Sequence, residues 1–204
     1  MICLRLSSGH GTATTISASS PPLSPPKGTR LVAVAHVEID RHEPPVVSDA
    51  QARDFAETLA ALHENLPGEF LQIDFEARSS QRDFYVKAVA ALRQRLPDAV
   101  LSATALTSWC LHERWTESLA VDEVVPMFFR MGPDSPRIRK YFADGGDFRS
   151  VNCRTSIGVA TDELPPAIPP GRRIYAFSPR RWNAETYHAL RMRIRQWSDA
   201  SRLY

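Results

Sequence analysis

The sequence predicts an α/β fold in which strands and helices alternate around a parallel sheet. From residue 31 onward, short runs with the two-residue hydrophobic period of strands alternate with longer runs that have the helical period. Short connections between such runs favour right-handed crossovers and parallel strands. Six clear strands, with a further candidate at residues 2–6, approach a (β/α)8 TIM-barrel-like parallel barrel. A doubly wound open sheet is the alternative.

A lead rich in Ser, Thr, Pro and Gly precedes these units. It contains Pro21-Pro22 and Pro25-Pro26, and this composition is typical of a linker or a poorly structured segment. We therefore expect a poorly structured lead over residues 1–30 and a barrel-like α/β domain over residues 31–204. The barrel is expected to be incomplete at its N-terminal end.

The first two strands of the domain, residues 31–40 and 70–77, each have one apolar face and one face that becomes ionisable toward its end. The polar faces contain His36, Glu38 and Asp40 on the first strand, and Gln72, Asp74 and Glu76 on the second. Burying a carboxylate is costly unless it is paired or used. Acids at the same end of two parallel strands therefore indicate a functional edge, and the alternative is that they are solvated or cap the following helices.

The later elements are marked by start and stop signals. Ser48 and Gln51 have the spacing of a capping box, Pro97 ends the second helix, and Pro136 suits the first turn of another. The remaining strands are expected at residues 100–108, 124–131, 155–161 and 173–178. A final helix opens near Asn183, and its expected buried residues are Tyr187, Leu190, Ile194 and Trp197.

Composition excludes several classes of protein. The formal net charge is +2 and no block of like charges marks a nucleic-acid tail, so we expect no nucleic-acid partner. The arginines that follow Arg172 are expected to form a solvated helix face. No stretch approaches the roughly 20 apolar residues of a membrane span, and the N-terminus lacks a signal-peptide pattern. We expect a soluble chain and make no prediction of compartment or oligomeric state.

The three cysteines, Cys3, Cys110 and Cys153, are expected to be small buried residues, because their number is odd and their spacing is not that of a metal site. No metal or cofactor is expected. Cys110 follows one strand and Cys153 precedes another, which in a parallel sheet separates them by roughly 20 Å. A disulfide needs Cα atoms within about 7 Å, so we expect none between them.

Four blocks of sequence resemble a bacterial domain-of-unknown-function family, number 3142. They lie in the same order at residues 71–77, 101–110, 125–132 and 153–163, and the resemblance extends over roughly residues 31–182. The family is uncharacterised and is thought to be a TIM-barrel domain akin to glycoside hydrolases. Its aromatic-rich first strand has no counterpart before Leu31, which predicts a truncated or divergent N-terminal end.

The resemblance implies a pair of catalytic acids. Glu76 would end the fourth barrel strand and Asp162 the seventh, the strands from which many barrel glycosidases draw their two carboxyl groups. Glycoside hydrolysis needs an acid with a raised pKa and a second group that is a nucleophile or activates water. Asp74 would adjust the proton affinity of the Glu76 carboxyl.

Other strand-end residues are candidates for substrate binding. Glu38 and Asp40 are suited to sugar hydroxyls, and the alternative for them is ion pairing with Arg41. Trp109 and Trp182 follow strands and offer ring faces on which a sugar can stack.

For both tryptophans the alternative is packing under a loop. Arg130 is expected either to neutralise a substrate or to pair with Asp162. Two functions remain open: a carbohydrate-active hydrolase, and a non-catalytic, degenerate barrel that binds a glycan or a partner protein.

Overall fold

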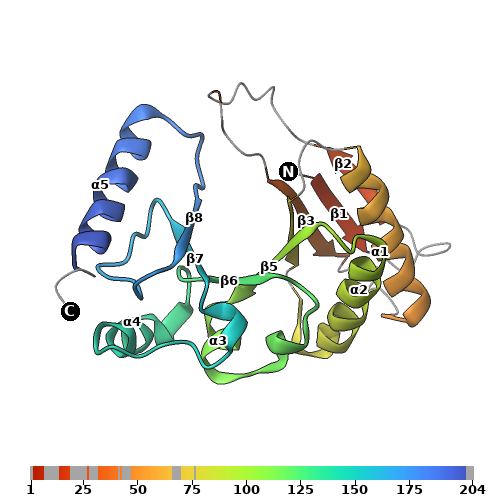
Figure 1. Cartoon of the computed structure of the whole chain (residues 1–204), viewed down its shortest axis with the longest axis horizontal. Coiled ribbons are helices and arrows are strands. Elements are labelled where there is room, and N and C mark those ends of the chain that lie inside the picture. Colours follow the sequence, from red (N-terminus) through yellow and green to blue (C-terminus); the bar gives the residue numbers. More distant parts are fainter. Residues whose placement is uncertain are drawn as a thin grey trace. The chain divides into compact units, whose positions relative to one another are not determined.

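The computed structural model describes residues 2–6, 14–18, 27, 32–40, 42, 47–65, 70–75 and 77–200. The chain divides into two compact units (Figure 1). The N-terminal unit is Met1–Thr104 with Ser118–Asp122, and the C-terminal unit is Ala105–Glu117 with Glu123–Tyr204. Each unit combines helices with strands that are mainly parallel, which confirms the α/β class.

The N-terminal unit has a sheet in the order β2-β1-β3-β4-β5. The strands are β1 (Ile2–Leu6), β2 (Thr14–Ala18), β3 (Ala33–Ile39), β4 (Phe70–Phe75) and β5 (Val100–Leu106). All neighbours pair in parallel except β1 and β2, which are antiparallel. The candidate strand at residues 2–6 is thus present as β1, whereas β2 lies within the lead that was expected to be poorly structured. Apart from Lys27, the rest of that lead lies outside the described residues.

Two helices cover the apolar face of β4 in this unit. They are α1 (Asp49–Glu64) and α2 (Arg82–Arg95), which lie side by side in Figure 1. The ring of Phe75 on β4 contacts Phe84 and Tyr85 of α2, with centroids 6.4 and 4.9 Å apart. Because apolar residues alternate with polar ones along β4, this packing turns Gln72 and Asp74 away from the helices.

The predicted N-cap at the start of α1 is present, but the reciprocal bond differs from that of a capping box because it goes to Val47 and not to Ser48. The Ser48 Oγ accepts a hydrogen bond from the backbone N–H of Gln51 at 3.2 Å. In return, the Gln51 Oε1 accepts one from the N–H of Val47 at 3.0 Å. The bond to Ser48 satisfies a donor that a helix start leaves without an intrahelical partner, so the helix begins where the sequence predicts.

The C-terminal unit has three parallel strands in the order β6-β7-β8. They are β6 (Glu123–Met127), β7 (Ser156–Ala160) and β8 (Arg173–Phe177), and the helices are α3 (Thr107–His112), α4 (Ser135–Ala143) and α5 (Ala184–Ala200). Two predicted strands are shorter than expected. The strand predicted at 100–108 ends at Leu106 because α3 begins at once, and the one predicted at 124–131 ends at Met127.

Helix α5 packs on this unit through fewer residues than predicted. Leu190 and Trp197 are buried with Val159 of β7, and Ile194 is half-buried against them. Tyr187, which was expected in the core, is 49 % exposed. It lies in the first turn of the helix, where the ring of Tyr187 contacts the guanidinium of Arg191 instead. Among the described residues, no helix is long and apolar enough to cross a membrane.

A buried carboxylate joins the three strands of the C-terminal unit near their starts. Glu123 is 4 % exposed and accepts hydrogen bonds from the hydroxyls of Ser156 and Tyr175. It also pairs with the Arg173 guanidinium at 3.2 Å. These donors offset the cost of burying a charge. Burial, together with the bond to Glu123, raises the pKa of Tyr175 to about 12.

The raised pKa of Tyr175 predicts loss of stability at high pH. The unfolded chain releases the phenol proton near pH 10, whereas the folded chain keeps it to about pH 12. The free energy of unfolding should therefore fall as pH rises through this window. Tyr175→Phe should reduce that fall in urea titrations, and Tyr187→Phe, at an exposed position, should not. An identical pH slope in Tyr175→Phe and wild type would contradict this explanation.

Candidate functional site

A row of polar side chains crosses the N-terminal unit toward the carboxyl ends of its parallel strands. The strand register places His36 of β3 beside Asp74 of β4. The Asp74 carboxylate accepts a hydrogen bond from the Thr104 hydroxyl of β5 at 2.6 Å, and its other oxygen lies 2.9 Å from His36 Nδ1. We refer to His36, Asp74 and Thr104 as the Asp74 row.

A second pair of polar side chains lies one pleat earlier on the same face. Gln72 of β4 donates a hydrogen bond to the Ser102 hydroxyl at 3.1 Å, and both side chains are buried. Burial and the charge of Asp74 together raise the pKa of the Tyr85 phenol. The Asp74 row is therefore the outer layer of a polar face whose inner layer is closed to solvent.

The Asp74 row has the partners and the access that acid–base chemistry requires. The side chains of His36 and Asp74 are 19 % and 20 % exposed, which leaves both within reach of solvent. An ionised carboxylate only accepts hydrogen bonds, so two donors fix its orientation. A histidine held by a carboxylate is a common general base.

The acids predicted on β3 lie beside this row. Glu38 is 48 % exposed, and one of its oxygens lies 3.5 Å from the Nε2 of His36. Asp40 follows the strand and accepts a hydrogen bond from the backbone N–H of His42 at 2.8 Å. Arg41, the expected alternative partner of both acids, lies outside the described residues. His36 thus stands between the inner carboxylate of Asp74 and the outer one of Glu38.

Glu76, the principal catalytic candidate, lies outside the described residues. Its chemistry and its pairing with Asp162 therefore stay predictions. Asp74, the predicted neighbour of Glu76, is in place on the polar face of β4. His36 and Thr104 complete the row but were not predicted as site residues. The signal for His36 was its place on the polar face of its strand; only the register between strands brings it to Asp74.

A separate group of charged residues follows the strands of the C-terminal unit. Arg130, after β6, donates from its guanidinium to Asp162 at 3.2 Å, and the backbone N–H of Arg130 donates to Glu163 at 2.9 Å. Glu163 also accepts from Arg139 at 2.7 Å. The predicted pairing of Arg130 with Asp162 is present, but both side chains are about half-exposed, and such pairs are weak.

The backbone of Arg130 is in an uncommon conformation. Its φ is 50°, in the left-handed region that residues other than glycine rarely adopt. The bond from its N–H to Glu163 holds it there, and the guanidinium carbon lies 5.8 Å from the centroid of the Phe129 ring. Unusual backbone geometry that its surroundings maintain is common at binding sites. Glu163, which sequence analysis left aside, is therefore the residue that positions Arg130.

The two candidate tryptophans have different environments. Trp109 of α3 is 6 % exposed and packs edge-on against Trp115, with ring centroids 5.0 Å apart. Trp109 is therefore a packing residue, because a buried ring cannot present its face to a sugar. The strand that was expected to expose this side chain ends before α3. Trp182, after β8, is 48 % exposed and keeps the property that a stacking platform needs.

The expectation that Cys110 and Cys153 are unbridged is wrong. They form a disulfide with Cα atoms 5.9 Å apart. The expected separation assumed that both lie on strand axes at opposite edges. Cys110 instead lies within α3, and Cys153 lies in a short turn, η4 (Val151–Cys153), and both elements contact β6.

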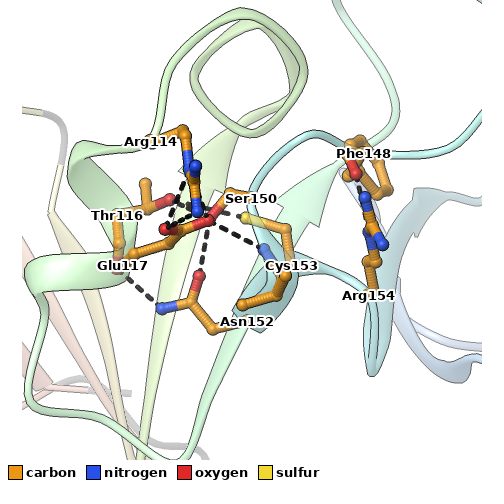
Figure 2. Close-up of polar contacts among 9 residues, drawn as sticks. Arg114, Thr116, Glu117, Phe148, Ser150, Asn152, Cys153 and Arg154 are labelled. Atoms are coloured by element: carbon orange, nitrogen blue, oxygen red, sulfur yellow. Dashed lines mark hydrogen bonds and ion pairs between the residues drawn. The ribbon is translucent and has the colours of Figure 1, made fainter.

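A hydrogen-bonded network that includes Cys153 holds the same segment (Figure 2). The hydroxyls of Thr116 and Ser150 lie 2.7 Å apart, and Asn152 donates to the carbonyl of Thr116 at 2.7 Å. Glu117 accepts from the N–H of Val151 and from Arg114, and the bond from Arg114 lowers the pKa of Glu117. The residues before β7 are therefore fixed to α3 by the disulfide, and to residues 114–117 after α3 by hydrogen bonds.

Comparison of the chain with protein-family models, with curated proteins and with solved structures found no match. The resemblance to the uncharacterised bacterial family therefore stays an expectation. Among the described residues, no group of three or more His, Cys, Asp or Glu side chains is placed to hold a metal ion. The Asp74 row and the charged group after β6 and β7 are therefore the features that bear on function.

Proposed function

We propose that this chain is a carbohydrate-active protein that hydrolyses a glycoside through carboxylates at the ends of its strands. The observation that carries the proposal is the Asp74 row: a partly exposed carboxylate, oriented by His36 and Thr104, at the C-terminal part of a parallel strand. In α/β folds with parallel strands, reaction chemistry is concentrated at that end.

In this proposal Glu76 is the general acid and Asp162 the second carboxyl group. Glu76 follows Asp74 by two residues, and a neighbouring negative charge favours retention of a proton to higher pH. Such retention is what a general acid for glycoside cleavage needs. Asp74 and His36 would set the proton affinity of the acid, and Glu38, Asp40, Arg130 and Trp182 would contact the sugar.

A barrel architecture is part of this proposal. We propose that the parallel strands belong to a (β/α)8-like barrel related to the uncharacterised bacterial family, and that β2, which is antiparallel to β1, is not one of its strands. The support is the parallel pairing within each unit and the alternation of strand and helix along the chain. A barrel of this kind would bring the strand ends that carry Glu76 and Asp162 to one edge.

The proposal is tested by a panel of chromogenic aryl glycosides and a glycan array, both applied to the full chain. We expect hydrolysis of at least one glycoside and binding of the corresponding glycan. Binding without hydrolysis would replace the enzyme by the non-catalytic, glycan-binding alternative. A chain that neither hydrolyses a glycoside nor binds a glycan would overturn the proposal in both forms.

A further inference from the structure

An exposed, arginine-rich segment follows β8 in the C-terminal unit. Arg180 and Arg181 are exposed, and Trp182 beside them is 48 % exposed. Neither arginine forms an ion pair with any residue that the structure describes. By contrast, Arg172 and Arg173, at the start of β8, pair with Asp147 and Glu123. Arg180 and Arg181 therefore present positive charge that the described part of the fold does not neutralise.

The segment lies at the same edge as Arg130 and Asp162. Strands β6, β7 and β8 are parallel neighbours, so their C-terminal ends share one edge of the sheet. The N–H of Thr161, after β7, donates to the carbonyl of Phe177 in β8 at 2.9 Å. The hydroxyl of Thr161 also donates to Ser178 at 3.1 Å. The ends of β7 and β8 are thereby tied together.

The residues of this edge suit a ligand that has both hydroxyls and carboxylates. A guanidinium binds a carboxylate with two parallel hydrogen bonds, and the exclusive use of arginine favours that mode over simple charge attraction. An exposed tryptophan ring stacks on the apolar face of a sugar. Asp162, whose pair with Arg130 is exposed and weak, can accept from sugar hydroxyls.

We infer that the edge formed by Arg130, Asp162 and Arg180–Trp182 binds an acidic polysaccharide that contains uronic acids. The inference rests on the proposed carbohydrate function and names its substrate class. A DNA duplex is disfavoured because its backbone offers phosphates but no free hydroxyls to Asp162. In a polyuronate the carboxylates alternate with hydroxyls, which matches the mixture of basic and acidic side chains.

The test is titration calorimetry of the full chain with polygalacturonate and with its methyl-esterified form, which has the same sugars without the charge. We expect binding to the acid form only, weakening as salt is raised. Replacement of both arginines, Arg180→Gln with Arg181→Gln, should weaken it at least tenfold, as should Trp182→Ala. Arg195→Gln, an exposed arginine on α5, should leave affinity unchanged; thermal melts confirm that each variant folds.

The outcomes separate the inference from the proposed function. Equal binding to the acid and the ester would overturn the acidic specificity while the carbohydrate function stands. Absence of binding to either would also overturn the inference, and the glycoside panel would still decide the proposed function. Stronger binding to double-stranded DNA than to polygalacturonate, abolished in the double arginine variant, would overturn the inference in favour of a nucleic-acid surface.

Discussion

Reduction of the disulfide between Cys110 and Cys153 should lower the free energy of unfolding by about 4 kcal/mol. The bridge spans 43 residues, and a cross-link over that length removes a corresponding amount of chain entropy from the unfolded state. Both cysteines are buried, so the two thiols stay within the core of the C-terminal unit after reduction. Urea unfolding of wild type with and without a phosphine reductant measures the difference.

The paired variant Cys110→Ser with Cys153→Ser should reproduce the effect of the reductant and become insensitive to it. Cys3→Ser is the matched control, since Cys3 is the third cysteine and has no part in this bridge. Alkylation under denaturing, non-reducing conditions should label a single thiol. Labelling of three thiols, or a midpoint unaffected by reduction, would show that the bridge does not form in solution. Because disulfides persist in oxidising compartments, a stable bridge would also favour folding outside a reducing cytosol.

Asp74→Asn should lower glycoside turnover by about 100-fold, the lower end of the range for an acid–base group, because Asp74 adjusts the proton affinity of the acid and does not itself transfer the proton. Asparagine has the same shape and can still accept from Thr104, so the hydrogen-bonded row is retained while its charge is lost. Without that charge, the His36 ring keeps only one of its two carboxylate neighbours, Glu38 near Nε2. Turnover at a range of pH values measures both the rate and its pH dependence.

A structural role and a chemical role for Asp74 are separated by matched variants. Asp83→Asn, an exposed acid on α2, should retain wild-type turnover, and Asp74→Asn should melt within a few degrees of wild type. His36→Gln should show a similar loss of turnover with a shifted pH profile. If Asp74→Asn is fully active, the Asp74 row is a packing feature of the sheet and has no part in hydrolysis.

Local patterns predicted the elements better than their ends. The alternation in β3 and β4 and the N-cap at Ser48 correspond to elements that are present. The strand predicted at 100–108 was too long because Thr107 and Ser108 continue an apolar, β-prone run, yet the chain turns into α3 there. In α3 the Thr107 hydroxyl donates to the carbonyl of Met127 at 2.6 Å, a tertiary contact that overrides propensity.

Contacts between segments far apart in the sequence could not be predicted from local patterns. His36 and Asp74 are 38 residues apart, and a shift of one residue in the register of β3 and β4 would turn them to opposite faces. The bridge of Cys110 to Cys153 has the same cause, since it depends on how α3 and the η4 turn pack on β6. Charge patterns marked the acids and arginines, but only strand pairing showed which of them meet.

The most direct measurement of the central claim is the turnover of the best glycoside in the panel by wild type and by Glu76→Gln. Glutamine keeps the size of the side chain and removes the proton that a general acid must donate. We predict near-wild-type stability and a loss of turnover of at least 100-fold, with Asp83→Asn unaffected. Equal turnover by wild type and Glu76→Gln would contradict the assignment of this carboxylate as the acid of a glycoside hydrolase.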